Sequence, residues 1–145
     1  MTAISAITAF SAHSADHFGS IKVYHDGRLV SKASGGKTYL VTGSNTKSRT
    51  RINFRDVTRD GWGTRAEVNQ QAYYRAKTSS GTTVTRWWKL SQDKTNWYGV
   101  ADGWRTSYLT ESTWRSRRYR AKPKMVHHTP WYKPDHTKKG SWQYP

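Results

Sequence analysis

The chain has 145 residues, a formal net charge of +16 and no cysteine. The length is typical of one domain, and the lack of cysteine excludes disulfides and cysteine-based metal sites. So basic a chain favours negatively charged partners, with an association that weakens in salt. No apolar run reaches the ~18 residues of a membrane-spanning helix. The composition predicts one domain without a transmembrane segment and with an anionic partner.

The expected core is aromatic. Leu, Ile, Val and Phe total only 19 residues, whereas the chain has eight Trp and nine Tyr. Few aliphatic residues and a high net charge usually indicate disorder. A buried aromatic ring, however, removes roughly 150–250 Å² from water. We therefore expect a folded domain whose core is built largely from Trp and Tyr.

Residues 1–18 are expected to be the remnant of a signal peptide or an extended N-terminal segment. Thr2–Ala15 carries no charge and ends in small residues, which resembles the rear of a secretory signal. The sequence thus predicts a secreted, extracellular protein. If the segment is retained, Thr2 to Phe10 could add as a strand to a partner's sheet.

From Ile21 onward the pattern is that of short strands separated by turns. Asp26-Gly27 lies between alternating segments and can supply the positive φ of a type I′ hairpin turn. Ser34–Lys37 is expected to form a second turn. Further strands are expected at 38–42, 49–57, 65–75, 82–90, 97–100, 104–110 and 113–121. This spacing predicts an all-β fold, with a single antiparallel β-sandwich over residues 19–121.

Residues 122–145 are expected to form a basic arm that contains Pro, His and Trp. All four prolines of the chain lie in this segment. Proline is confined mainly to strand edges and irregular structure, because it has no backbone N–H. The sequence therefore predicts that the sandwich ends at residue 121 and that an extended arm follows.

The stretches Ile21–Ser31 and Arg51–Gly61, followed by a strand ending in Tyr73-Tyr74-Arg75, resemble small secreted β-sandwich proteins of actinobacteria. Some of these are similar to the bridging subunit of umbrella-type antibacterial toxin particles. That subunit joins a lectin-like propeller protein to a toxin-bearing stalk. The resemblance covers Gly19–Leu90 and implies an assembly role with protein partners. The basic C-terminal segment departs from the family pattern.

A segment of interleaved arginines and rings, Trp114–Arg120, is the clearest candidate for binding a polyanion. Arginine pairs with phosphate and aromatic rings stack on bases, so this pattern suits nucleic acid, teichoic acid or lipid headgroups. The alternative is an edge strand whose charges prevent aggregation. Trp87 is expected to point outward and Trp88 inward. The candidate contact residues are Arg115, Arg117, Arg118, Arg120, Lys122, Lys124, Trp114, Tyr119 and Trp87.

Metal binding and catalysis find little support. His127, His128 and His136 could ligate Zn, Cu or Ni, but their spacing matches no established pattern and nearby lysines would repel a cation. We therefore predict no metal and no cofactor. His25-Asp26 is a His–acid pair, but it lies at a predicted turn, so we predict that the protein is not an enzyme.

Two functions follow from this sequence. The first is a secreted, non-enzymatic binding or assembly subunit, bridging components of an antibacterial toxin complex as the resemblance implies. The alternative is a cationic protein, bacteriocin-like in character, that binds nucleic acid or a cell-wall polymer. A nuclease ranks third.

Overall fold

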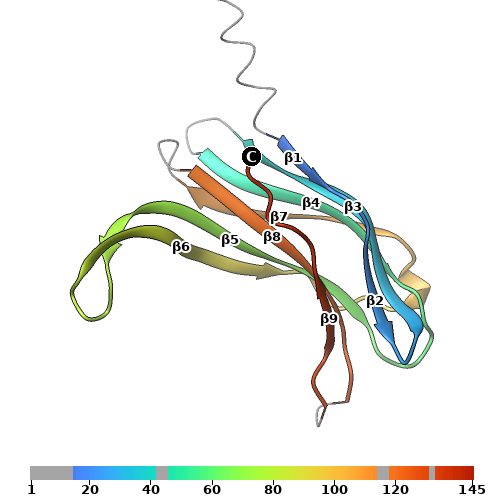
Figure 1. Ribbon diagram of the computed structural model, residues 1–145. Helices are drawn as coiled ribbons and strands as arrows, with labels where there is room; N and C mark the ends of the chain where they lie inside the picture. Colours follow the sequence, from blue (N-terminus) through green and yellow to red (C-terminus); the bar gives the residue numbers. More distant parts are fainter. Residues whose placement is uncertain (1–14, 42–45, 114–117, 131–132) are drawn as a thin grey trace, which may run out of the picture.

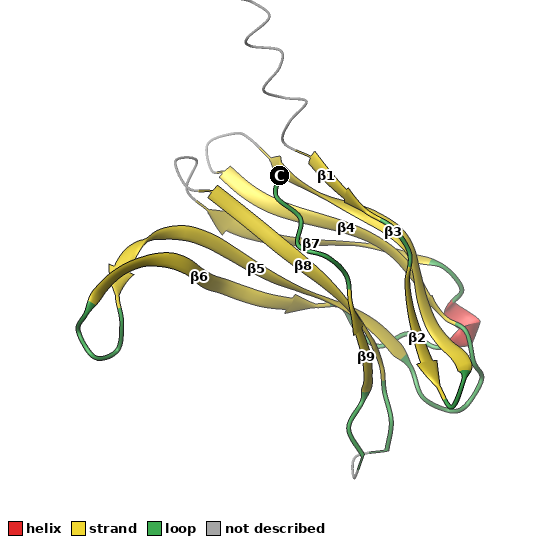
Figure 2. Cartoon of the chain, in the orientation of Figure 1, coloured by secondary structure: helices red, strands yellow, loops and turns green. Residues whose placement is uncertain are grey.

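Two antiparallel β-sheets packed face to face make up the fold (Figure 1). The computed structural model describes residues 15–41, 46–113, 118–130 and 133–145. These residues form the strands β1 (Ala15–Phe18), β2 (Ile21–His25), β3 (Arg28–Val41), β4 (Thr46–Asp56), β5 (Thr64–Lys77), β6 (Thr83–Lys94), β7 (Arg105–Thr113), β8 (Arg118–His127) and β9 (His136–Lys139), and the 3₁₀ helix η1 (Val100–Asp102). Strands dominate the chain in Figure 2. The prediction of an all-β antiparallel sandwich is confirmed.

The strand order places distant segments side by side. The first sheet, here sheet A, has the order β1-β3-β4-β7, and β2 also pairs with β3. The second, sheet B, has the order β6-β5-β8-β9. The β5–β6 hairpin curves away from the rest of the molecule (Figure 1). In the part of the chain that the structure describes, no helix has the length and apolar character needed to cross a bilayer.

The β2–β3 hairpin turns as its sequence predicts. Asp26 and Gly27 have φ angles of 50° and 76°, the positive values that a type I′ turn requires at both central positions. The turn expected at Ser34–Lys37 is wrong, because β3 continues through it with a bulge between Ala33 and Gly35. A Cβ on Gly36 would lie 2.1 Å from the carbonyl oxygen of Arg51 and 2.6 Å from the Phe18 ring. The glycine therefore permits close packing rather than chain reversal.

The core differs from the aromatic one that composition suggested. Its largest fully buried apolar side chains are Phe54, Ile52, Met125, Val30 and Val68. Every described Trp is exposed or half-buried. Four alanines without exposed surface, at positions 33, 66, 72 and 121, line the space between the sheets. Small residues let the sheets approach closely and leave no room for indole rings. The tryptophans that the structure describes are consequently surface residues, and core packing alone does not explain them.

Sheet B continues past residue 121 and takes in part of the expected arm. β8 runs to His127, and β9 follows and pairs with it. Beyond β9, Gln143 forms two backbone hydrogen bonds with Ala121, at 2.9 and 2.7 Å. The backbone N–H of Tyr144 donates to Asp16 Oδ2 in β1 at 2.9 Å. Residues 140–145 therefore lie along the sandwich instead of extending away from it.

Candidate basic-aromatic binding face

Strand β8 carries a row of cations on its outer side. Its side chains alternate between buried and outward-facing along most of the strand. The outward-facing positions are Arg118, Arg120, Lys122 and Lys124. Alternate residues of a strand lie about 6.6 Å apart on one face. Four positive charges therefore form a line across sheet B.

The neighbouring strands place aromatic rings beside this row. Tyr73 in β5 pairs with both Trp87 in β6 and Arg118 in β8, so the three side chains share one face. The guanidinium carbon of Arg118 lies 4.5 Å from the centre of the Tyr73 ring. On the other side of β8, Trp142 follows β9 and is half-buried. We call this surface the basic-aromatic face: Gln71, Tyr73, Trp87, Arg118, Arg120, Lys122, Lys124 and Trp142.

Arg120 has the closest ring contacts of the cations on this face. Its guanidinium carbon lies 4.4 Å from the centre of the Trp87 ring and 4.0 Å from that of Trp142. Its Nε–H donates to Gln71 Oε1 at 2.8 Å. Stacking on indole rings and the hydrogen bond fix the plane of the guanidinium. A ligand would therefore meet its terminal Nη groups in a preset orientation.

A pocket of about 310 Å³ extends this face toward β9. It is lined by Glu67, Asn69, Lys122, Lys124, Lys139 and Trp142. Glu67 is 6% exposed and pairs with Arg65 at 2.9 Å and with Lys124 at 3.4 Å. The carboxylate is thus already engaged with two cations, and three lysines and an indole ring border the opening.

The structure brings several of the sequence-predicted contact residues together on this face: Arg118, Arg120, Lys122, Lys124 and Trp87. Tyr119 is a correction, because it is only 3% exposed and its ring packs in the core. The alternation of β8 that turns its arginines outward necessarily turns Tyr119 inward. Trp114, Arg115 and Arg117 lie outside the described residues.

Sequence reasoning missed Tyr73, Gln71 and Trp142 as members of the face. Tyr73 and Gln71 occupy alternate positions of β5, but only the strand register reveals that they lie beside β8. Trp142 was assigned to the arm. The polar and aromatic alternation of Trp142, Gln143 and Tyr144 is the signal that could have indicated a docked, extended segment.

Sheet A also carries cations over aromatic rings, and each of those described lies over a single ring. The closest is Arg105, whose guanidinium carbon is 4.5 Å from the centre of the Tyr98 ring. Lys32 and Arg55 lie 5.5 and 5.6 Å from the centre of the Trp104 ring. Arg51 is exposed on the same sheet. No guanidinium of sheet A, in the segments described, is recorded between two indole rings as Arg120 is. Sheet A therefore provides a natural comparison for the basic-aromatic face.

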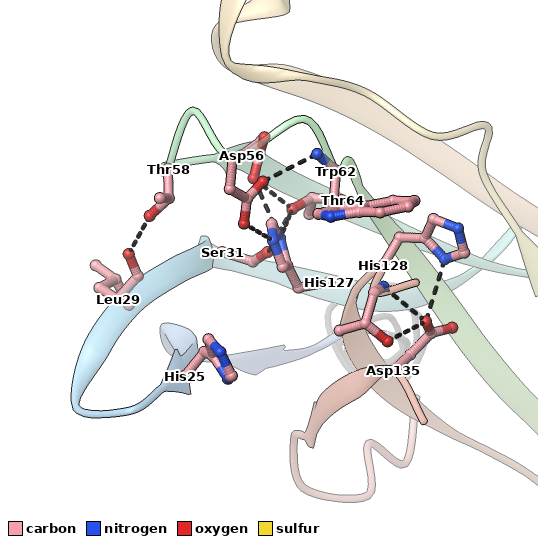
Figure 3. A network of polar contacts seen from close by, with 12 residues as sticks. His25, Leu29, Ser31, Asp56, Thr58, Trp62, Thr64, His127, His128 and Asp135 are labelled. Carbon is pink, nitrogen blue, oxygen red and sulfur yellow. Dashed lines mark hydrogen bonds and ion pairs between the residues drawn. The ribbon is translucent and has the colours of Figure 1, made fainter. Parts of the chain in front are cut away.

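A second polar site lies at the end of the sandwich where β8 meets the β4–β5 loop (Figure 3). His127 is 2% exposed and holds a carboxylate at each ring nitrogen. Its Nδ1 is 3.2 Å from Asp56 Oδ1, and its Nε2 is 2.8 Å from Asp60 Oδ2. The hydroxyls of Ser31 and Thr64 lie 3.0 and 3.1 Å from Nδ1 and are in close contact with each other. The network joins β3, β4, β5 and β8.

The two carboxylates determine the charge of His127. Burial is the largest effect and lowers its pKa, but hydrogen bonds to Asp56 and Asp60 outweigh burial and raise the pKa above its usual value. Burial also acts to raise the pKa of Asp60, but hydrogen bonds from His127 and from the backbone N–H of Trp62 lower it. Both shifts favour an imidazolium held between carboxylates. Its role is to join strands, because both ring nitrogens are engaged within the fold.

The three histidines considered for metal binding do not converge. His127 is engaged at both nitrogens, and His128 Nδ1 lies 3.1 Å from Asp135 Oδ1. The His136 ring instead lies beside that of His25, with centres 4.2 Å apart. Within the described segments, no group of three His, Cys, Asp or Glu side chains is arranged to hold a metal ion.

Comparison with protein-family models, with curated proteins and with solved structures finds no match.

Proposed function

We propose that this protein binds linear anionic polymers that carry phosphate groups, and that it does so without catalysis, through the basic-aromatic face. The observation that carries this proposal is the position of Arg120 between Trp87 and Trp142. The two rings hold this guanidinium on the surface in one orientation, and the group does not contribute to the hydrophobic core. Its fork of donors matches the oxygens of a phosphate.

The arrangement favours reading of phosphates over stacking of bases. Arg120 already covers faces of both indole rings. Trp87 also makes T-shaped contacts with Tyr73 and Tyr144, with ring centres 5.4 and 6.0 Å apart. The rings thus serve mainly to orient cations. Such a face would bind phosphodiesters regardless of base sequence, including polymers without bases, such as teichoic acids.

The row of cations favours an extended ligand. Arg118, Arg120, Lys122 and Lys124 follow one another at about 6.6 Å, so a line of roughly 20 Å along β8 carries positive charge. A single strand can adjust its phosphates to such a line more easily than a rigid duplex can. Single-stranded nucleic acid and teichoic acid share this chemistry.

The bridging role in an antibacterial toxin assembly and the secreted location remain predictions from the sequence. A protein partner held by buried apolar surface would stay bound in high salt, because apolar contacts are not screened. A polyanion would be released. Measurements in a salt series therefore separate the two functions.

The test is the affinity for a labelled single-stranded oligonucleotide, and for its abasic counterpart, by fluorescence anisotropy between 0.05 and 0.5 M salt. Each neutralised phosphate of a single strand contributes about −0.7 to the slope of log affinity against log salt. Contacts with four phosphates predict a slope of about −3. We expect similar affinities for the two oligomers, since the phosphates carry the recognition.

The matched variants are Arg120→Gln and Arg51→Gln, which remove the same charge from opposite sheets. We expect Arg120→Gln to weaken binding and to reduce the slope by about 0.7, and Arg51→Gln to change both far less. Equal losses in the two variants would contradict the assignment to sheet B. Loss of binding to the abasic oligomer alone would show that bases, not phosphates, are recognised.

A further inference from the structure

A cleft of about 440 Å³ lies at the end of the sandwich, away from the cation row of β8. Its charged and titratable walls come from the β2–β3 turn, the β4–β5 loop, the end of β8, the following loop and β9. The principal ones are His25, Arg28, Asp60, His127, Lys133 and His136. Trp62 borders the same cleft with an exposed indole.

The central feature of this cleft is a pair of histidines from opposite sheets. His25 ends β2 of sheet A, and His136 begins β9 of sheet B. Their ring centres are 4.2 Å apart, and the planes are inclined by 38°. Two imidazolium ions at this distance repel each other strongly. The pair can therefore hold two protons only where a negative charge compensates for them.

The carboxylates near the pair do not supply all of that compensation. Asp60 is engaged with His127 Nε2 at 2.8 Å, and Asp135 with His128 at 3.1 Å. Asp26 lies 3.4 Å from His25 Nε2, but its side chain is 89% exposed and well solvated. Arg28 and Lys133 add positive charge to the walls.

His136 responds to this environment in the expected direction. Partial burial is the largest effect lowering its pKa, and the positive potentials of His25 and His127 lower it further. Asp26 and Asp135 act in the opposite direction. Without a bound anion, the second proton of the pair is thus disfavoured at neutral pH.

We propose that this cleft is a binding site for a tetrahedral oxyanion, such as a phosphate or sulfate group, which enters together with protons on His25 and His136. The anion would lie in the cleft beside the two adjacent imidazolium rings and would face Arg28 and Lys133. The volume exceeds that of an inorganic ion and leaves room beside Trp62 for the organic part of an ester. Because the two histidines belong to different sheets, the anion would also join β2 to β9.

Linkage gives the size of the effect. If the anion raises the pKa of one histidine by one unit, its affinity for the protonated protein is tenfold higher than for the neutral protein. Two coupled histidines increase this ratio. His127 also lines the cleft and has a raised pKa, so its protonation can add to the pH dependence. The share that belongs to the pair is the part that disappears when both histidines are replaced.

The test uses inorganic sulfate, which remains a dianion across the range, so that any pH dependence belongs to the protein. Sulfate is titrated at pH 5.5 and 7.5 with chloride at matched ionic strength, and the ring protons of the histidines are followed by NMR. We expect saturable shifts of His25 and His136, with at least tenfold tighter binding at pH 5.5. A parallel titration with glycerol 3-phosphate at pH 5.5 establishes whether the cleft accepts an ester.

Two variants make the assignment specific. The double variant His25→Gln/His136→Gln should lose most of the pH dependence, whereas His17→Gln, an exposed histidine in β1, should retain it in full. Equal affinity at the two pH values, or a pH dependence that is undiminished in the double variant, would overturn the proposal. Thermal unfolding of each variant verifies that it folds. Arg120→Gln should weaken oligonucleotide binding but leave sulfate binding in the cleft unchanged. The two proposals can therefore fail independently of each other.

Discussion

The guanidinium carbon of Arg120 lies 4.0 Å from the centre of the Trp142 ring, although one residue belongs to β8 and the other follows β9. The contact connects a central strand of sheet B with the segment that docks along it. The orientation of the Arg120 guanidinium therefore depends on the neutral indole of Trp142, and a variant of Trp142 can test this dependence.

Replacing Trp142 with Ala should weaken polyanion binding without removing any charge. Trp142 lies under the Arg120 guanidinium and also 4.8 Å from the Lys122 ammonium, so its removal loses two cation–π contacts. Together these correspond to about 1–2 kcal/mol, or roughly 5- to 30-fold in affinity. The slope of log affinity against log salt should remain that of the intact protein, since the number of phosphate contacts is unchanged. Trp104→Ala is the matched control, because Trp104 carries looser cation contacts on sheet A. A comparable loss in that control would argue against sheet B.

Replacing Arg120 with Lys should separate geometry from charge. Lysine keeps the positive charge but has no planar fork to stack between the rings or to donate from Nε to Gln71. We expect weaker binding, by a factor comparable to that of Trp142→Ala, and an unchanged salt slope. Anisotropy titrations of the two oligomers provide both quantities. Full affinity in this variant would mean that the stack plays no part in recognition.

The His127 network should make stability depend on pH at both ends of the range. The raised pKa of His127 gives stabilisation that is complete below its ordinary value of 6.5 and is lost as the pH rises through the raised value. The lowered pKa of Asp60 gives stabilisation that is present above 3.8 and is lost as the pH falls through the lowered value. Their joint contribution is therefore greatest between about pH 4 and 6.5.

Urea unfolding of His127→Gln across pH 3–9 tests this assignment. Leaving two carboxylates without their buried cation should cost about 3–5 kcal/mol near pH 6. The decline of stability above pH 6.5 should be smaller than in the parent protein. His17→Gln should behave like the parent. If the variant retained the full alkaline decline, the titrating group would lie elsewhere.

Core and surface rings should differ in their contributions to folding. Phe54 has no exposed surface and packs edge-on against Tyr98, so Phe54→Ala should cost about 3–5 kcal/mol. Trp88 faces the inner side of sheet B as expected, but it is half-buried and donates from Nε1 to the carbonyl of Tyr74 at 2.8 Å. Trp88→Ala should cost only about 1–2 kcal/mol. A lower urea midpoint for Trp88→Ala than for Phe54→Ala would instead support a core built from Trp and Tyr.

Local signals in the sequence predicted local structure well. Asp26-Gly27 specified its hairpin, and the alternation up to Ala121 predicted a strand. The prediction ended too early at Pro123 because proline lacks an N–H. In the structure the Ala121 N–H and the Pro123 carbonyl both bond residues of the 140–143 stretch. The proline nitrogen faces that side rather than β5, so no hydrogen bond of the β5–β8 ladder is lost.

Contacts that depend on register could not be predicted in this way. His127 and Asp60 are 67 positions apart. The sequence alone placed His127 in an extended arm and explained Asp60 by the geometry of a turn, so nothing linked the two. Only the pairing of Thr64 with His127 across β5 and β8 brings them together. The same holds for Tyr73 and Arg118. Charge and aromatic content indicated the class of ligand, whereas the face itself emerges from strand order.

The alternation of β8 has a consequence for how this protein can change. One side of the strand fills the core and the other presents the cations, so deleting or inserting one residue would exchange the two sides beyond that point. Guanidinium groups would then face the alanines of the interior, and Tyr119 would face water. Length changes in this strand should therefore be strongly destabilising, whereas substitutions at the outward-facing Arg118 or Lys122 should change stability little. The affinity for a polyanion can therefore change in small steps through single substitutions, but the number of residues in β8 cannot change without strong destabilisation.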